Sequence, residues 1–222
     1  MATKPNNADS SDNQQIPDVQ FLRNQITSFW NELVEKDRII AELHRQLDNE
    51  RREISLNCHY NYVARCQYDL ATQQLYENLI GDVLTAKYPN LVNVQPYGED
   101  GDWKCDFNHR GAQELWQAFA PEKITEANLK AKIVKTLSDT FSSVTNKKSP
   151  GITKAWGDIK KVVFAFRTEH LPPKILEFLR TEAVRLEVEI GVYLTPNFMD
   201  DVSHLTITQK MRIFGPPPTW LS

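Results

Sequence analysis

The fold of this chain is decided by two short segments, Tyr97-Gly98-Glu99-Asp100-Gly101-Asp102-Trp103-Lys104-Cys105-Asp106-Phe107 and Glu114-Leu115-Trp116-Gln117-Ala118-Phe119. The first segment reads as an acid-rich turn that contains glycine, followed by a strand that carries Asp106. The second reads as another strand, which carries Gln117. Because Arg110-Gly111 lies between them, we expect the two strands to form a hairpin. Neighbouring strands that each direct an oxygen ligand at the same point can form a divalent-metal site.

A long helix is predicted before these segments, because residues 19–80 contain neither glycine nor proline. Two heptad series run through it. They are Ile26, Leu33, Ile40, Leu47, Ile54 and Leu22, Phe29, Lys36, Leu43, Glu50. Two members, Lys36 and Glu50, are polar. On the flanks, Glu32 is expected to pair with Lys36, and Arg38 with Glu42.

The heptads predict a coiled coil that makes the protein a homodimer through residues 22–54, because an isolated amphipathic helix of this length buries too little. Its orientation, parallel or antiparallel, is left open by the pattern. The alternative is a helix that folds back on its own domain. We expect residues 19–72 to form this helix and residues 1–18, which are polar and aperiodic, to be disordered.

The rest of the chain predicts one α/β domain over residues 73–215, followed by a proline-rich tail at 216–222. Pro89 ends a helix, and a short strand at 91–96 precedes the hairpin. The continuous apolar run at 162–166 predicts a strand buried on both faces. Further helices are expected at 121–144, 171–186, 196–204 and 209–214, with a strand at 188–194. This order implies a mixed central sheet with helices on both faces.

Charge is unevenly distributed along the chain. The net charge is only −3, but residues 123–161 contain nine lysines against three acidic residues, a local charge of +6. A basic surface beside an acidic turn is compatible with phosphate binding, and a solvated lysine-rich face is the alternative. Candidate nucleic-acid contacts are Lys123, Lys130, Lys147 and Lys148.

Three cysteines, Cys58, Cys66 and Cys105, form neither a disulfide framework nor a zinc motif. No apolar run approaches the roughly 20 residues of a membrane span. We therefore expect a protein of a reducing, cytoplasmic compartment, with no membrane partner.

The element order and several residues together resemble the PD-(D/E)XK nuclease superfamily, especially its Mrr-like restriction endonuclease branch. The matching residues are Tyr76-Glu77 on the first helix, Gly101-Asp102 in the turn, Asp106 on one strand and Gln117 on the next. The resemblance covers about residues 73–205 and implies a restriction-endonuclease-like α-β-β-β-α-β-α-β core. Gln117 followed by Ala120-Pro121-Glu122 is also similar to nuclease-like modules of bacterial anti-phage defence systems, which implies a protein partner in such a system.

The resemblance implies hydrolysis of phosphodiesters in DNA with Mg²⁺ or Mn²⁺. Asp106 would anchor the ion, Gln117 would offer an amide or backbone oxygen, and Glu77 would hold a second ion or a bound water. The family's lysine, two residues after Gln117, is replaced by Phe119. Alternation along the strand puts Phe119 on the face of Gln117.

A substitute lysine would have to come from elsewhere. Lys104 is the best candidate because it shares a face with Asp106 on a regular strand. Lys123 is the next nearest in sequence, and Lys130 is a poorer choice.

Two functions follow. The first is a dimeric nuclease-fold protein that cuts or binds DNA with a divalent ion, and Asp106, Glu77 and the lysine-rich segment favour it. The second is a catalytically inactive copy of that fold that serves as an interaction or assembly subunit, which Phe119 favours. Each candidate residue also has a purely structural alternative. Asp106 can bind turn amides, Gln117 can be a buried amide, and Glu77 can be solvated.

Overall fold

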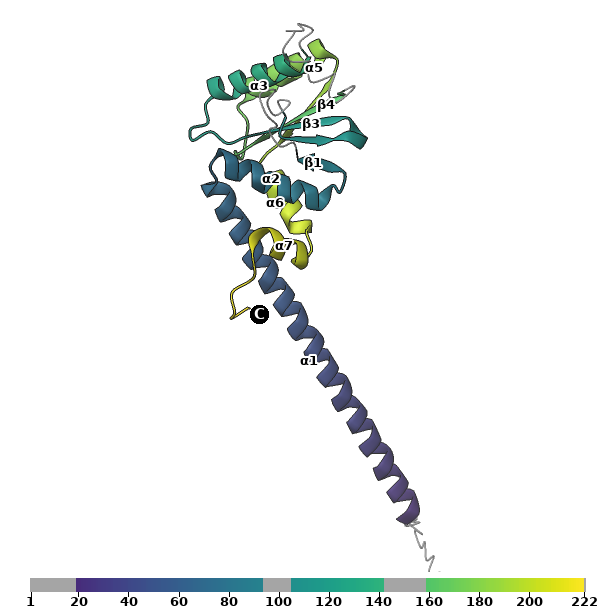
Figure 1. Cartoon of the computed structure of the whole chain (residues 1–222). Helices are drawn as coiled ribbons and strands as arrows, with labels where there is room; N and C mark the ends of the chain where they lie inside the picture. Colours follow the sequence, from purple (N-terminus) through teal and green to yellow (C-terminus); the bar gives the residue numbers. More distant parts are fainter. Residues whose placement is uncertain (1–18, 94–104, 142–158, 222) are drawn as a thin grey trace, which may run out of the picture. The chain divides into compact units, whose positions relative to one another are not determined.

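The computed structural model describes residues 19–93, 105–141 and 159–221 of the chain (Figure 1). The chain divides into two compact units, residues 1–52 and residues 53–222. Helix α1, Val19–Leu70, contributes to both of them. None of the described helices is long and apolar enough to cross a membrane.

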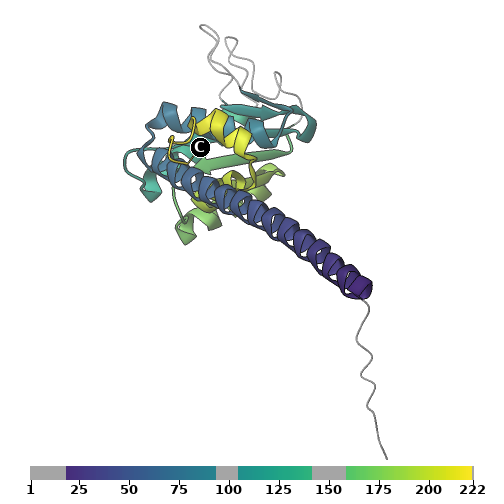
Figure 2. The ribbon, with the colours of Figure 1, turned by 90° about the horizontal axis from the view of Figure 1, so that it is seen from below.

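The described part of the first unit consists of residues 19–52 of α1, which are helical without interruption (Figure 2). The predicted ion pair between Glu32 and Lys36 is present at 2.7 Å. The predicted pair of Arg38 with Glu42 is wrong. Arg38 bonds Glu35 instead, while Glu42 bonds Arg45, both at 2.7 Å. Residues three apart are also neighbours on a helix surface, so each arginine reaches back by one turn.

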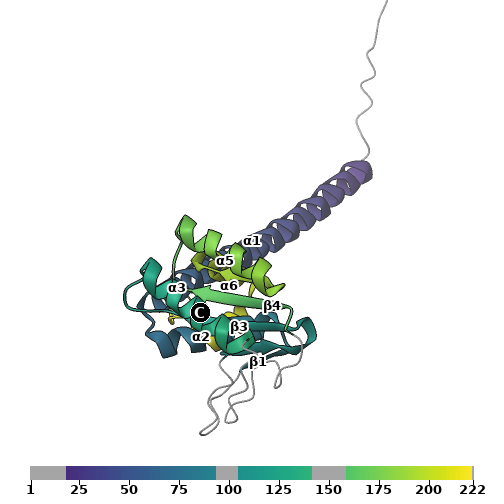
Figure 3. The ribbon, with the colours of Figure 1, turned by 90° about the horizontal axis from the view of Figure 1, so that it is seen from above.

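The second unit contains a five-stranded mixed sheet. After the end of α1 come α2 (Gln73–Lys87), β1 (Leu91–Asn93), β2 (Phe107–His109), a short 3-10 turn (Arg110–Ala112), β3 (Glu114–Phe119), α3 (Glu126–Phe141), β4 (Lys161–Phe166), α5 (Pro173–Leu186), β5 (Glu189–Tyr193), α6 (Thr195–His204) and α7 (Ile207–Phe214). The strands lie in chain order. The first three are antiparallel and the last two continue parallel to β3, so the predicted hairpin and mixed sheet are confirmed (Figure 3).

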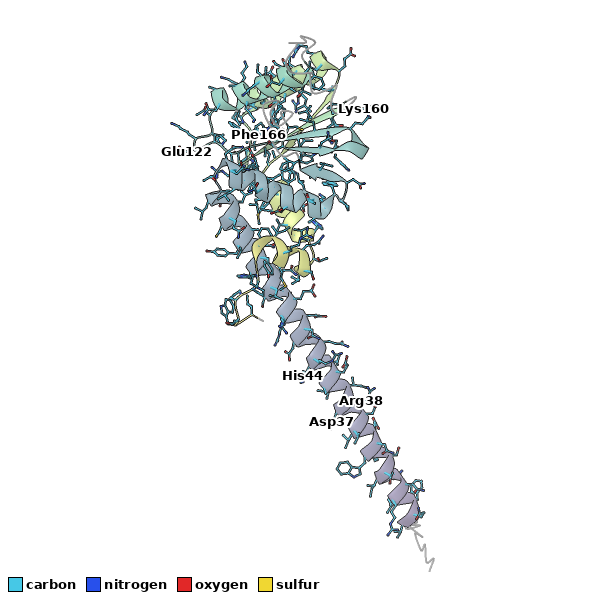
Figure 4. The ribbon with its side chains drawn as sticks, in the orientation of Figure 1. Asp37, Arg38, His44, Glu122, Lys160 and Phe166 are labelled. Carbon is cyan, nitrogen blue, oxygen red and sulfur yellow. The ribbon has the colours of Figure 1, made fainter. Side chains whose placement is uncertain are left out.

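Helices cover both faces of the sheet (Figure 1). One apolar layer packs the sheet against α2, α6, α7 and the last part of α1. The other packs it against α3 and α5. Residues of β3 alternate between them, with Trp116 and Ala118 in the first layer and Leu115 in the second. β4 is buried on both faces, as its apolar run predicted, and Phe166 at its end is fully buried (Figure 4).

One helix boundary differs from the prediction by more than two residues. The helix expected from residue 121 begins at Glu126. Thr125 explains the delay, because its hydroxyl accepts a hydrogen bond from Asn128 N at 3.1 Å, the bond of a helix N-cap. The residues before it form a connection. The predictions for residues 1–18, for the Gly101-Asp102 turn and for the helix end at 144 lie outside the described residues.

Candidate functional site

Asp106 and Gln117 meet across the hairpin. Asp106 directly precedes β2, and its backbone N–H donates to Trp116 O at 3.0 Å, which extends the ladder by one residue. Gln117 lies within β3, with only 6% of its surface exposed. Its Nε2 donates to Asp106 Oδ2 at 2.5 Å. The two side chains that the sequence predicts as metal ligands are thus in direct contact.

The same carboxylate also closes the edge of β3. Asp106 Oδ2 accepts a second hydrogen bond, from Ala118 N at 2.6 Å. Ala118 lies past the last residue of β3 that β2 pairs with, so its N–H has no strand partner on that side. Asp106 therefore supplies an acceptor that the neighbouring strand does not. The carboxylate thus accepts from one backbone amide, in strand β3 and not in a turn, and from the side-chain amide of Gln117.

Gln73 continues this closure from the first turn of α2. Its Nε2 donates to Ala118 O at 3.1 Å, and its Oε1 accepts from Ala120 N at 2.7 Å. One amide side chain thus behaves like the backbone of a neighbouring residue in a sheet. Gln73 Nε2 also donates to Glu77 Oε1 at 2.6 Å. Glu77, half-buried, is therefore linked to β3 through Gln73.

The side chains of Tyr76 and Glu77 lie in different surroundings. Tyr76 is fully buried, and its hydroxyl lies 3.4 Å from that of Tyr68. Burial raises the pKa of Tyr76, so this phenol stays protonated and serves the core. Of the pair, only Glu77 is available to the candidate site.

Asn108 adds a polar group that the sequence analysis missed. Phe107 and Trp116 both pack into the α2 layer, so alternation places Asn108 and Gln117 together on the opposite face. Asn108 is 1% exposed, and its Oδ1 has no hydrogen-bond partner among the described residues. An unpaired buried acceptor costs about 1 to 3 kcal/mol. A polar ligand on this face would remove that cost.

Phe119 stands at the strand position where the nuclease pattern would have a lysine, and a lysine of α3 contacts its ring. Phe119 follows Gln117 by two residues on the same face, roughly 7 Å along the strand. Lys132, on α3, holds its Nζ 5.4 Å from the centroid of the Phe119 ring. An ammonium group therefore lies at the phenyl ring that replaces the lysine.

A signal for Lys132 exists in the sequence. Leu129 and Ile133 are buried in the layer between α3 and the sheet, and Lys132 directly precedes Ile133 on the flank of that face. Helical spacing alone thus puts it near the sheet. Gln73 carries a weaker signal, since it lies one helical turn before Glu77.

The lysines that the sequence analysis chose are placed differently. Lys104, Lys147 and Lys148 lie outside the described residues. Lys123 is exposed. Lys130 Nζ lies 4.8 Å from the centroid of the Phe178 ring, so its contact is with α5.

The described donor set suits a hard cation. No group of three histidine, cysteine, aspartate or glutamate side chains gathers anywhere in the described ranges. Asp106, Asn108 and Gln117 instead share one face of the sheet, where Asp106 and Gln117 are in contact, and Glu77 is linked to β3 through Gln73. Carboxylate and amide oxygens are ligands that Mg²⁺ accepts, usually together with waters.

Comparisons of the chain with known protein families, with curated proteins and with solved structures return no match. Function is therefore inferred from the geometry of these side chains.

Proposed function

We propose that the chain hydrolyses phosphodiester bonds in DNA with a divalent cation, at a site built from Asp106 and Gln117. The contact between these two side chains across β2 and β3 carries the proposal. The order from α2 through the three antiparallel strands to α3 and the parallel β4 also supports a restriction-endonuclease-like core. Asn108 and Lys132 supply the remaining polar groups.

Mg²⁺ or Mn²⁺ at such a site supplies a Lewis acid for the phosphoryl group and lowers the pKa of bound water. Asp106 would hold the ion through its carboxylate and Gln117 through Oε1, because Nε2 is engaged with Asp106. Asn108 Oδ1 would accept a hydrogen bond from a water molecule in the same place. Glu77, which lies on α2 and is linked to β3 through Gln73, would hold a bound water.

Lys132 takes the role that the family gives to its strand lysine. Its ammonium group is half-buried against Phe119 and carries the positive charge that a developing phosphorane needs. Stacking on the ring restricts the side chain, and this orients the charge before substrate binds. Phe119 thus holds Lys132 in position, in addition to replacing the lysine of the nuclease pattern.

DNA is proposed as substrate because of the lysines of α3. Besides Lys132, this helix carries exposed Lys130 and Lys135, against the two acidic residues Glu126 and Asp139. Lysines that follow a helix surface neutralise backbone phosphates without reading sequence. Weak dependence on DNA sequence and strong dependence on salt are the expected result.

A second function, that of an inactive nuclease-like subunit, is favoured by one observation. Asp106 Oδ2 already accepts from both Gln117 and Ala118, which is a complete structural role at the edge of β3. In this case the fold would present its surfaces to a protein partner in a defence system and would cut nothing.

Incubation of supercoiled plasmid DNA with Mg²⁺, Mn²⁺ or EDTA separates the two functions. The matched variants are Asp106→Asn, which keeps an acceptor for Ala118 N, and Asp200→Asn, an exposed change on α6. We expect metal-dependent nicking by the native chain and by Asp200→Asn, and loss of nicking in Asp106→Asn. No nicking by the native chain, or equal nicking by all three proteins, would favour the inactive subunit.

A further inference from the structure

The first half of α1 carries an exposed apolar seam. Members of both heptad series are exposed, among them Phe29 at 64%, Leu33 at 52% and Leu43 at 56%. The ion pairs Glu35–Arg38 and Glu42–Arg45 occupy heptad positions c and f, on the far side of the helix. Apolar residues on one side and paired charges on the other are typical of a helix that pairs with another helix.

We propose that residues 29–54 of α1 pair with the same residues of a second copy of the chain, in antiparallel orientation. This inference is independent of the hydrolytic function. The second copy is favoured over another partner because the seam is complementary in charge to itself. Lys36 and Glu50, the two polar members of the seam, provide this complementarity.

A parallel pair would place like charges together. Each seam residue then faces its own copy, so Lys36 meets Lys36 and Glu50 meets Glu50. On the flank, Glu32 would face Asp37 of the second copy, since positions g and e five residues apart meet in parallel coils. All three contacts are repulsive.

An antiparallel pair with Ile40 opposite Leu43 reverses these contacts. In that register Leu33 lies opposite Glu50, and Lys36 lies opposite Leu47, one layer away. Lys36 of each copy is then next to Glu50 of the other, and symmetry makes this contact twice. Opposite charges in adjacent seam layers stabilise the pair and select the register.

The flanking positions agree with this register. Position e of one helix now faces position e of the other, which brings Asp37 opposite His44 and Trp30 opposite Arg51. The first pair joins an acid with a base, and the second allows a cation–π contact. Asp37 and His44 stand out from α1 (Figure 4). One like-charge contact remains, between Glu32 and Glu53, and Glu32 is already paired with Lys36.

Charge exchange in the full-length chain tests the contact. Lys36→Glu and Glu50→Lys should each raise the dimer dissociation constant roughly tenfold, because two attractive contacts become repulsive. The double variant Lys36→Glu/Glu50→Lys should return it close to the native value. Additive effects without recovery would overturn the antiparallel register, and sedimentation of the native chain only as a 25.6 kDa species would overturn the dimer.

A distance measurement tests the orientation without altering the seam. A spin label at Asn24→Cys, with Cys58 and Cys66 replaced by serine, sits at an outward position near the start of α1. At 1.5 Å per residue, the antiparallel register separates the two labels by about 50 Å, whereas a parallel pair brings them within about 20 Å. The long distance supports the proposal and the short one overturns it.

Discussion

The ammonium group of Lys132 lies 5.4 Å from the centroid of the Phe119 ring. Phe119 is the residue at which the nuclease pattern would have a lysine, two positions after Gln117. The charge therefore reaches this end of β3 from α3 instead of from the strand itself. The absence of a lysine at position 119 therefore leads to a specific prediction about Lys132.

Replacement of Lys132 should abolish most of the activity. Lys132→Ala is expected to reduce metal-dependent plasmid nicking about 100-fold or more, the usual contribution of a positioned proton-transfer or charge-stabilising group. Lys130→Ala is the matched control, because it removes a lysine of the same helix that contacts Phe178. Similar losses in both variants would indicate general DNA binding instead.

Relocation of the lysine should restore part of the activity. In the double variant Phe119→Lys/Lys132→Ala, an ammonium group returns to the strand position of the family pattern. We expect a nicking rate well above that of Lys132→Ala alone, measured at equal protein concentration. A double variant as inactive as the single one, with an unchanged circular dichroism spectrum, would argue against an exchange of roles.

Gln73 should contribute to stability through β3. Gln73→Leu leaves Ala118 O and Ala120 N without the partners that they have in the structure. We expect a loss of about 1 to 3 kcal/mol in the free energy of unfolding, measured with urea. Gln74→Leu, an exposed neighbour, should change it by no more than about 0.5 kcal/mol. Equal effects would refute the role of Gln73 as a strand surrogate.

A buried charge network joins α2, β5 and α6. Asp201 is 5% exposed, accepts from the Tyr193 hydroxyl at 2.9 Å and forms an ion pair with Lys87. Asp201→Ala should cost about 1 to 3 kcal/mol, because it leaves the buried Tyr193 hydroxyl without its acceptor, whereas Lys87, with a side chain 41% exposed, can be solvated. Asp200→Ala, next to it but exposed, is the control. A small loss in both variants would show that the network contributes little.

Lys210 should make stability depend on pH. The side chain is fully buried, with Nζ 2.7 Å from Asn57 Oδ1, and burial lowers its pKa below 10.5. The unfolded chain then binds more protons than the folded one as pH rises toward 10.5, so stability rises over that interval.

Urea unfolding of the native chain and of Lys210→Met tests this dependence. The difference in the free energy of unfolding between the native chain and Lys210→Met should increase as pH rises toward 10.5. Lys174→Met is an exposed change on α5, and its free energy of unfolding should vary with pH as that of the native chain does. A difference between native and Lys210→Met that is constant with pH would contradict the assignment.

The sequence predicted the elements with the strongest patterns. The apolar run of β4, the hairpin at Arg110-Gly111 and the uninterrupted helix to residue 70 all follow from local chemistry. Asp106 and Gln117 were placed together because neighbouring strands align their side chains. These features depend on spacing along the chain, which a sequence displays directly.

The remaining site residues depend on contacts distant in sequence. Gln73 bonds Ala118 and Ala120 across more than forty positions of sequence. Nothing in the sequence around Gln73 indicates that its side chain would bond β3 as a neighbouring strand does. Asn108 reads as a hairpin residue until its burial is known. Lys132 was overlooked in favour of Lys130, although the helical spacing of Leu129 and Ile133 orients Lys132 toward the sheet.

In the proposed function, Asp106 and Gln117 hold a divalent cation and do more than close the edge of β3. Titration with Mn²⁺ while the side-chain amide resonances are observed by NMR tests for this cation site, because Mn²⁺ broadens signals close to it. We predict early, saturable broadening of the Gln117 and Asn108 amide signals in the native chain, and none in Asp106→Asn. Broadening that is uniform over the surface, or equal in both proteins, would contradict the claim.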